Sequence, residues 1–285
     1  MANLRDIRRR IRSARNIQQI TRAMKFVSAA RLRRAQDRVI AARPYARQIT
    51  AVLNSLATRV PEHVHPLLSR RGDDKIELVV ISADRGLCGA YNTNIIRHAL
   101  EFLNAHAGKH VRLSILGKRA RDFFRKQPYP VRNEAINILQ KVSFADAVAI
   151  AKDLIDEFVR EEIDQVWLVY NEFKSVVHQR VVIEPLLPIK RLERADYAYG
   201  IDYIYEESPA QILSRLLPRY VEAQVFRVLL EAAASEHGAR MTAMEAATNN
   251  ASEMIEGLTL YANKVRQASI TKELIEVVTG AVSTG

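Results

Sequence analysis

The chain lacks several features that mark common classes of protein. It has one cysteine, Cys88, so no internal disulfide framework exists, and a single thiol is typical of a reducing compartment. No apolar run approaches the ~18–20 uninterrupted residues that a membrane-spanning helix needs. The apolar content is nevertheless 48%, which is ample for a globular core in 285 residues. These absences indicate a protein without membrane spans, on the cytosolic side of a membrane.

Proline is missing from both ends of the chain. None occurs before Pro44 and none after Pro218. Because proline disrupts the interior of a helix, its absence permits helices much longer than the usual ~11–12 residues. We expect one helix from about residue 3 to 57 and a second from about 213 to 280. Two such helices on either side of a compact middle segment predict an elongated helical shaft joined to a globular domain.

The first of these helices has an apolar stripe at steps of three and four residues, as an amphipathic helix requires. The stripe changes phase after Ala14 and is interrupted by the basic residues around Arg31. A perfect heptad coil is therefore not expected along it. The predicted buried positions are Leu4, Ile7, Ile11, Ala14, Ile17, Ile20, Met24, Val27, Ala35, Val39, Ala42, Ala46, Ile49, Leu53 and Leu56.

The second helix shows a stricter pattern. Its apolar and small residues alternate by four and three over five heptads, which is a coiled-coil seam. His237 lies in this seam and is interpreted as a packed side chain rather than a ligand. The seam consists of Leu230, Ala234, His237, Met241, Met244, Thr248, Ala251, Ile255, Leu258, Ala262 and Val265.

The natural partner of one seam is the other, packed antiparallel. The second helix is then longer by roughly 13 residues, or about 20 Å at the ~1.5 Å rise of a helix. That surplus end contains Ile270, Leu274, Ile275, Val277 and Val278. An apolar helix end of this kind is unfavourable in water, so we expect another chain to surround it.

The net positive charge of the chain comes from the first helix. Residues 1–47 contain 14 basic residues against Asp6 and Asp37, whereas the remaining 29 basic and 30 acidic residues nearly cancel. Such a helix can be a solvated face, can neutralise nucleic-acid phosphates, or can meet acidic loops of a partner protein. Phe26 is the only aromatic residue before Tyr45, so the stacking residues common in nucleic-acid binders are scarce.

The middle segment alternates strand and helix signals. This alternation predicts a mostly parallel, Rossmann-like sheet covered by helices. The expected strands are 76–82, 111–116, 165–170 and 179–184, and the expected helices are 91–107, 118–124 and 144–162. The fold class is thus α/β plus a long antiparallel coiled coil, with a coiled-coil helix at 1–60, a globular domain at 61–207 and a second coiled-coil helix at 208–285.

No chemistry of an enzyme is evident on this sheet. The turn Gly86–Gly89 lacks the G-x-G-x-x-G spacing of dinucleotide-binding proteins, and Gly117-Lys118 has Arg112 where a P-loop needs its first glycine. The histidines have no cysteines or acidic set to complete a metal site. Cys88 is interpreted as a buried small side chain rather than an activated thiol. We expect no catalytic residue, cofactor or metal.

Four blocks of the sequence resemble the gamma subunit of the F-type ATP synthase. They follow one another in the order of that family and extend from one end of the chain to the other. The last one carries the terminal pattern I-T-x-E-x-x-E-x-x-x-G-A. The chain lacks the dithiol insertion of chloroplast forms, which favours a bacterial-type subunit. The blocks are residues 20–32, 82–92, 239–247 and 266–273, the last extending to Ala281.

The resemblance implies a non-catalytic rotor in the central stalk, peripheral to the cytoplasmic face of a bacterial plasma membrane. Its expected partners are the alpha and beta subunits of the catalytic hexamer, the epsilon subunit and the c-subunit ring. At matching positions it assigns Met24, Lys25, Arg266, Gln267, Thr271 and Glu273 to contacts with the beta and alpha subunits. It assigns Tyr205 and Glu206 to the c ring.

Two other classes of function remain open at this stage. A basic coiled-coil nucleic-acid-binding protein would use the first helix on phosphates, and a nucleotide-dependent enzyme would use the middle sheet. Titration with short duplex DNA over a salt series distinguishes the first, and titration with labelled ATP the second.

Overall fold

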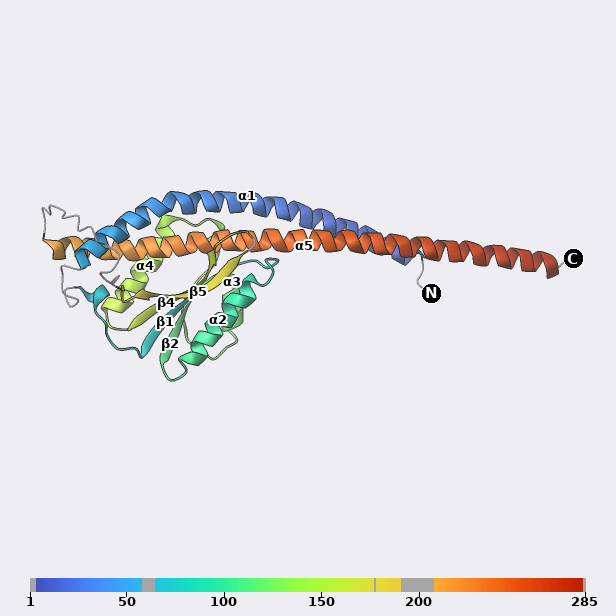
Figure 1. Cartoon of the computed structure of the whole chain (residues 1–285). Helices are drawn as coiled ribbons and strands as arrows, with labels where there is room; N and C mark the ends of the chain where they lie inside the picture. The colour runs from blue at the N-terminus through green and yellow to red at the C-terminus, as the bar shows by residue number, and fades with distance from the viewer. Residues whose placement is uncertain (1–3, 58–64, 177, 191–207, 284–285) are drawn as a thin grey trace. The chain divides into compact units, whose positions relative to one another are not determined.

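The computed structural model describes residues 4–57, 65–176, 178–190 and 208–283 (Figure 1). Two very long helices, α1 (Leu4–Ala57) and α5 (Pro209–Ser283), stand before and after a middle segment of strands and shorter helices in the sequence. The middle segment contains η2 (Pro66–Leu68), β1 (Lys75–Ile81), α2 (Tyr91–Ala105), β2 (His110–Leu116), α3 (Lys118–Phe124), β3 (Val131–Ala135), η3 (Ile138–Gln140), α4 (Phe144–Val159), β4 (Gln165–Phe173) and β5 (Gln179–Leu187).

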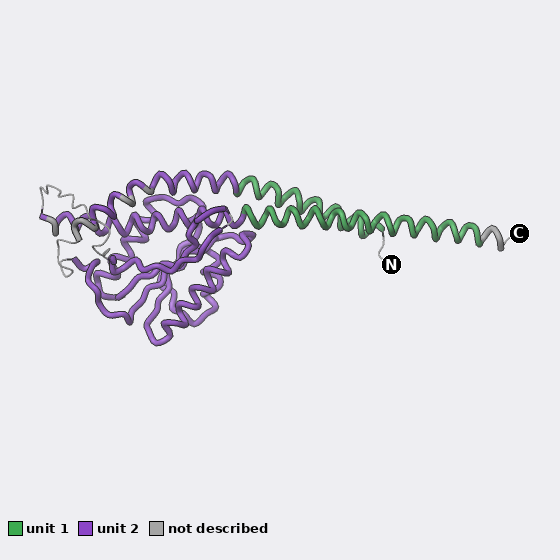
Figure 2. Tube along the Cα trace, in the orientation of Figure 1, with its two compact units in different colours: residues 1–28, 241–285 green, residues 29–240 purple. Residues whose placement is uncertain are grey.

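The chain forms two compact units, and both long helices contribute to each (Figure 2). Unit 1 consists of residues 1–28 and 241–285, and unit 2 of residues 29–240. Unit 1 is thus built from the two chain ends, whereas unit 2 contains the whole sheet together with the inner parts of α1 and α5.

The sheet of unit 2 has five strands in the order β3-β2-β1-β4-β5. The strands β1 to β4 are parallel and β5 pairs antiparallel with β4. Strand β1 lies at the centre, and six of its seven residues are buried. A parallel strand that is buried on both faces needs apolar residues at nearly every position, which explains the run Ile76–Ile81.

Helices cover both faces of this sheet. On one face α2 and α3 pack on Ile76, Leu78 and Val80. On the other face α4 and the inner part of α5 pack on Val79 and Ile81, together with Ile49 and Leu53 of α1. Successive residues of a strand point to opposite faces, so β1 supplies the centre of both apolar cores.

Polar groups tie α5 to the sheet domain within unit 2. The Tyr91 hydroxyl donates to the Ala232 carbonyl (3.1 Å), and Ser235 Oγ donates to the Asn171 carbonyl (2.9 Å). Burial raises the pKa of the Tyr91 phenol well above its usual range, so the group stays a donor. Arg227 of α5 donates to the Tyr170 hydroxyl (3.1 Å) and forms an ion pair with Glu184. Hydrogen bonds inside the apolar contact fix α5 in one position on the sheet.

The expected fold class is confirmed, and the four predicted strands and five predicted helices all occur. Strand β3 was not predicted, because its residues VRNEA contain no apolar run and lie half-buried at the sheet edge. Helix α5 begins at Pro209 rather than near 213 and continues through Pro218. Buried Leu213, Leu217 and Val221 hold this first part against the core, and that packing outweighs the break that a proline favours.

A buried carboxylate lies on the α4 face of the sheet. Glu77 of β1 is fully buried and accepts hydrogen bonds from Ser114 Oγ (2.5 Å) and Arg132 Nε (3.0 Å). Arg132 also pairs with Asp153 of α4 (2.6 Å), and Arg112 bridges Glu77 to Glu157. The network therefore links β1, β2 and β3 to α4, and a buried charge of this kind is tolerated only while its partners are present.

We predict that Arg132→Met lowers the free energy of unfolding by about 3–5 kcal/mol, because it leaves Glu77 buried without its main partner. Arg125→Met is the matched control. Arg125 pairs with Glu134 at 2.7 Å but is 58% exposed, so solvent screens the pair and its loss is expected to change the stability little. Urea denaturation measures both, and equal effects of the two substitutions would show that the network carries no special stability.

Candidate functional site

Three polar pairs join α1 to α5 inside unit 1. Gln18 Nε2 donates to Ser252 Oγ (2.7 Å), the hydroxyls of Thr21 and Thr248 share a hydrogen bond (2.8 Å), and Lys25 Nζ pairs with Glu245 (2.6 Å). As the residue number rises along α1 from 18 to 25, the number of its partner on α5 falls from 252 to 245, so the two helices are antiparallel. We call these three pairs the polar ladder.

The polar ladder corrects the predicted seam of α1. In unit 1 the less exposed positions alternate by four and three without a change of phase. Ile17, Ile20 and Val27 were predicted to be buried, but each is more than half exposed. The prediction failed because it followed apolarity, whereas the heptad continues through polar residues that hydrogen-bond across the interface. The buried or half-buried positions are Leu4, Ile7, Ile11, Ala14, Gln18, Thr21, Lys25 and Ser28. Met24, which lies beside Lys25, is half-buried as predicted.

The predicted seam of α5 is confirmed. Met244 and Ala251 are buried in unit 1, and Ile255, Leu258, Ala262 and Val265 are each less exposed than their neighbours. The seam ends at Val265, because every described residue from Arg266 to Thr279 is exposed. In the register of the polar ladder, Val265 lies opposite Leu4, the first described residue of α1. The end of α5 therefore has no partner among the described residues of unit 1.

The exposed apolar side chains of unit 1 include two groups, besides Met254, Leu260 and Tyr261 of α5. The first group, on α1, includes Ile17, Ile20, Phe26 and Val27, and Phe26 is 61% exposed. The second group is the unpaired end of α5, with Ile270, Leu274, Ile275, Val277 and Val278, each between 48% and 69% exposed. Apolar surface of this extent on one unit is typical of a protein-protein interface.

The predicted contact residues of α5 lie on this unpaired end. Arg266, Gln267, Thr271 and Glu273 are all exposed. Thr271 Oγ1 donates to the Gln267 carbonyl (3.0 Å), and Glu273 accepts from Ser269 Oγ (3.2 Å). The hydroxyl of Thr271 thus bonds to its own helix, while the Gln267 amide, the Arg266 guanidinium and the Glu273 carboxylate face solvent.

The predicted contact residues on α1 are placed differently. Lys25 is only 31% exposed, and its ammonium group is held by Glu245. A partner that uses Lys25 must therefore approach an ion pair rather than a lone charge. Tyr205 and Glu206, assigned to the c ring by resemblance, lie outside the described residues.

The glycine-containing turn after β1 has a structural role in unit 2. The Asp84 carboxylate accepts hydrogen bonds from the backbone amides of Lys118 and Asn137, both at 3.0 Å. It therefore links the turn to the start of α3 and to the segment before η3. Cys88 is 1% exposed, and burial raises the pKa of its thiol, which agrees with the predicted inert side chain.

The part of the chain that the structure describes holds neither a metal-ligand cluster nor a candidate membrane span. It contains no group of three or more His, Cys, Asp or Glu residues that could hold a metal ion. None of its helices is both long and apolar enough to cross a membrane.

Known proteins resemble this chain along nearly its whole length. The family model described as ATP synthase matches residues 3–283. The ATP synthase gamma chain of Solibacter usitatus is 54% identical over 287 residues, and the match covers 99% of each chain. A solved structure of the mitochondrial ATP synthase of Tetrahymena thermophila, central stalk and c ring, contains a chain that is 26% identical with a TM-score of 0.61. That match covers 80% of this chain and 99% of the other.

A second solved structure supports the fold alone. A chain in the mitochondrial ATP synthase of Euglena gracilis is 19% identical with a TM-score of 0.68, and the match covers 99% of this chain and 94% of that one. The similar fold, the long helices around a mostly parallel sheet and the full-length match to curated relatives agree with one another. This chain belongs to the ATP synthase gamma chain family.

Proposed function

We propose that this chain is the rotor of the central stalk in a proton-translocating F-type ATP synthase and catalyses no reaction itself. The observation that carries the proposal is the unpaired apolar end of α5 in a member of the gamma chain family. We infer that this end lies inside the hexamer of alpha and beta subunits, which covers its apolar side chains. The other proposed partners are the epsilon subunit and the c-subunit ring.

A rotor of this kind acts through differences in binding free energy. One asymmetric pair of helices inside a ring of three alike catalytic subunits makes different contacts with each. Each subunit is thereby biased toward a different conformation, and rotation moves the bias to the next subunit. Rotation of the c ring is in this way coupled to ATP synthesis, and ATP hydrolysis to the reverse rotation. The chain would be peripheral to the cytoplasmic face of a bacterial plasma membrane, held there by the complex.

The polar residues before and within the unpaired end of α5 are proposed to bind the hexamer. Arg266, Gln267 and Glu273 have side chains directed to solvent, and Thr271 lies one turn beyond Gln267. Amide and charged groups give directional hydrogen bonds that an apolar sleeve contact cannot replace.

We predict that Gln267→Leu and Thr271→Ala each lower ATPase turnover or assembly, because a partner group is left unpaired at a cost of about 1–3 kcal/mol. Thr279→Ala is the matched control. Thr279 is also exposed and donates to the carbonyl four residues before it, at 2.8 Å compared with 3.0 Å for Thr271. If Thr271→Ala acted only by removing the hydrogen bond within the helix, both threonine substitutions would change ATPase turnover and assembly equally. That result would contradict the proposed contact.

Removal of residues 277–285 is expected to impair the complex less than Gln267→Leu, since apolar sleeve contacts are distributed and non-directional. Rotation and ATPase assays on the assembled complex make the comparison. If the deletion abolishes rotation while Gln267→Leu and Thr271→Ala are silent, the roles assigned to the two parts of this end are reversed.

Met24, Lys25 and the arginines near them are proposed to contact acidic loops of the beta subunits. We predict that Lys25→Glu impairs ATP-driven proton pumping more than assembly. Because Lys25 pairs with Glu245, the substitution is made in a Glu245→Gln background, which removes repulsion inside the chain. Glu245→Gln alone is the control. If the double variant pumps protons as well as this control, the proposed contact is contradicted.

Tyr205 and Glu206 are proposed to touch the polar loops of the c ring. Cysteine at either position, in a Cys88→Ala background, is expected to form a disulfide with a cysteine in a c-ring loop when the complex is oxidised. Gel electrophoresis of the assembled complex detects the product. Absence of product at both positions, with the ring assembled, would count decisively against this contact.

A further inference from the structure

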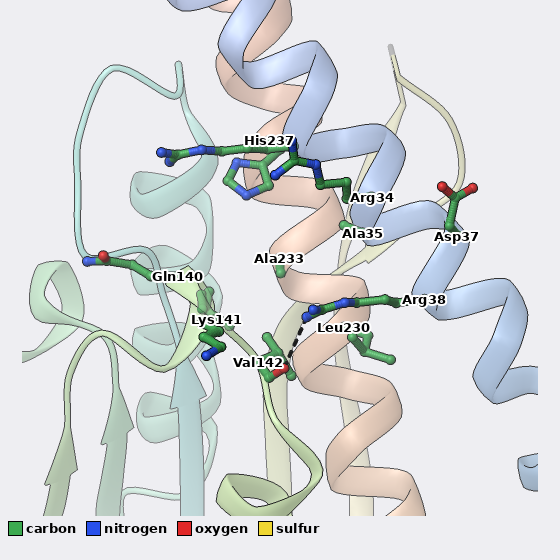
Figure 3. Close-up of a pocket in the computed structure, with 12 residues that line it drawn as sticks. Arg34, Ala35, Asp37, Arg38, Gln140, Lys141, Val142, Leu230, Ala233 and His237 are labelled. Atoms are coloured by element: carbon green, nitrogen blue, oxygen red, sulfur yellow. Dashed lines mark hydrogen bonds between the residues drawn. The ribbon is translucent and has the colours of Figure 1, made fainter.

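A cavity of about 600 Å³ lies within unit 2, between α1, the segment 139–142 at the end of η3, and α5 (Figure 3). Its size is within the ~300–1,000 Å³ range of sites for small molecules. Part of its wall is apolar and includes Leu139, Val142 and Leu230, and its polar groups come from all three segments. We call this cavity the basic pocket.

Four cationic side chains line the basic pocket: Arg31, Arg34 and Arg38 of α1, and Lys141 after η3. Arg38 donates to the Val142 carbonyl at 3.2 Å. Arg31, Arg34 and Lys141 form no ion pair with any residue that the structure describes. The one acidic lining residue, Asp37, points away from α5, whereas Arg34 and Arg38 extend toward it (Figure 3). Several positive charges around one cavity raise the local concentration of anions.

His237 of α5 supplies a second, independent indication of a missing partner. It is only 8% exposed and lines the basic pocket, and its Nδ1 is buried with no hydrogen-bond partner in the described chain. Burial, and to a smaller extent the nearby Arg240 and Arg31, together lower the pKa of this imidazole to about 4. A buried polar atom without a partner costs free energy, and native proteins keep few of them. A ligand in the pocket would remove that cost.

The donors determine the class of ligand. Guanidinium groups bind phosphate oxygens through two parallel N–H bonds, and an ammonium group binds them as a point charge. Four cations spread over two sides of the cavity exceed what one phosphate group can contact. We propose that the basic pocket binds a small anion with two or more phosphate groups, which Arg34 and Lys141 hold from opposite sides. All residues that line the pocket belong to unit 2, so this proposal does not depend on the contacts proposed for unit 1.

The test is isothermal titration calorimetry of inorganic pyrophosphate into the full-length chain, free of other subunits so that no nucleotide site of a partner contributes. We expect saturable binding of one pyrophosphate per chain at about 0.15 M salt. The double variant Arg34→Gln/Lys141→Gln is expected to weaken it at least tenfold. Both residues are exposed, so the fold tolerates the change, which circular dichroism checks.

The matched control is Arg33→Gln/Lys126→Gln, which removes the same two kinds of charge from exposed positions outside the pocket. Its affinity is expected to stay within about twofold of the unaltered chain. No saturable binding, or an equal loss in both double variants, would overturn the proposal.

Two further titrations identify the source of the anion. ADP that binds more tightly than pyrophosphate would indicate an organic ligand that uses the apolar wall, and pyrophosphate that binds equally or more tightly would indicate an inorganic one. Binding of a short Asp- and Glu-containing peptide without binding of pyrophosphate would overturn the phosphate assignment in favour of an acidic protein segment.

Discussion

The pairing register of α1 and α5 in unit 1 is the constraint on which the functional surfaces depend. The polar ladder fixes that register, since Gln18, Thr21 and Lys25 each bond to one residue of α5. A shift of one heptad would separate all three pairs and leave polar groups without partners in a largely apolar seam. Because the register is fixed, the position at which α5 loses its partner is fixed as well. The apolar end beyond Val265 is therefore a defined surface and not a frayed terminus.

The same register accounts for the exposed apolar residues of α1. A seam built only from apolar side chains would bury Ile17, Ile20 and Val27. The polar ladder takes the seam positions instead, and these side chains are left on the outer face together with Phe26. These apolar side chains of unit 1 are therefore not buried within the chain, and their surface remains available to other chains. Polar seams and apolar outer faces suit helices that pair specifically and are then enclosed by partner subunits.

Much of this molecule could be predicted from the sequence, and the failures have physical causes. The alternation of strands and helices gave the sheet and its covering helices, because buried parallel strands such as Ile76–Ile81 are continuous apolar runs. Strand β3 lacks such a run and was therefore not predicted. The seam of α5 was predicted correctly because its residues are apolar or small. The seam of α1 was not, because its partners Ser252, Thr248 and Glu245 lie more than 200 residues away and no local pattern reveals them.

Of the two candidate sites, one could be predicted from the sequence and the other could not. The unpaired end of α5 followed from helix lengths alone, and its contact residues from the resemblance. The basic pocket had no signal in the sequence, since Arg31, Lys141 and His237 come together only after α1, η3 and α5 have packed in unit 2. Arginines at positions 31, 34 and 38 form one stripe of a helix, but a stripe of this kind is also expected on a solvated face. Only the cavity and the unpartnered His237 nitrogen distinguish the two.

Disulfide formation within the chain tests the register most directly. In a Cys88→Ala background, the pair Thr21→Cys/Thr248→Cys is expected to cross-link rapidly on mild oxidation, since the two hydroxyls are 2.8 Å apart. The pair Ile20→Cys/Thr248→Cys serves as the comparison, because Ile20 is 59% exposed on the outer face of α1. The account predicts a rapid cross-link for the first pair and a much slower one for the second. Faster cross-linking of the second pair would place Ile20 in the seam and contradict the register.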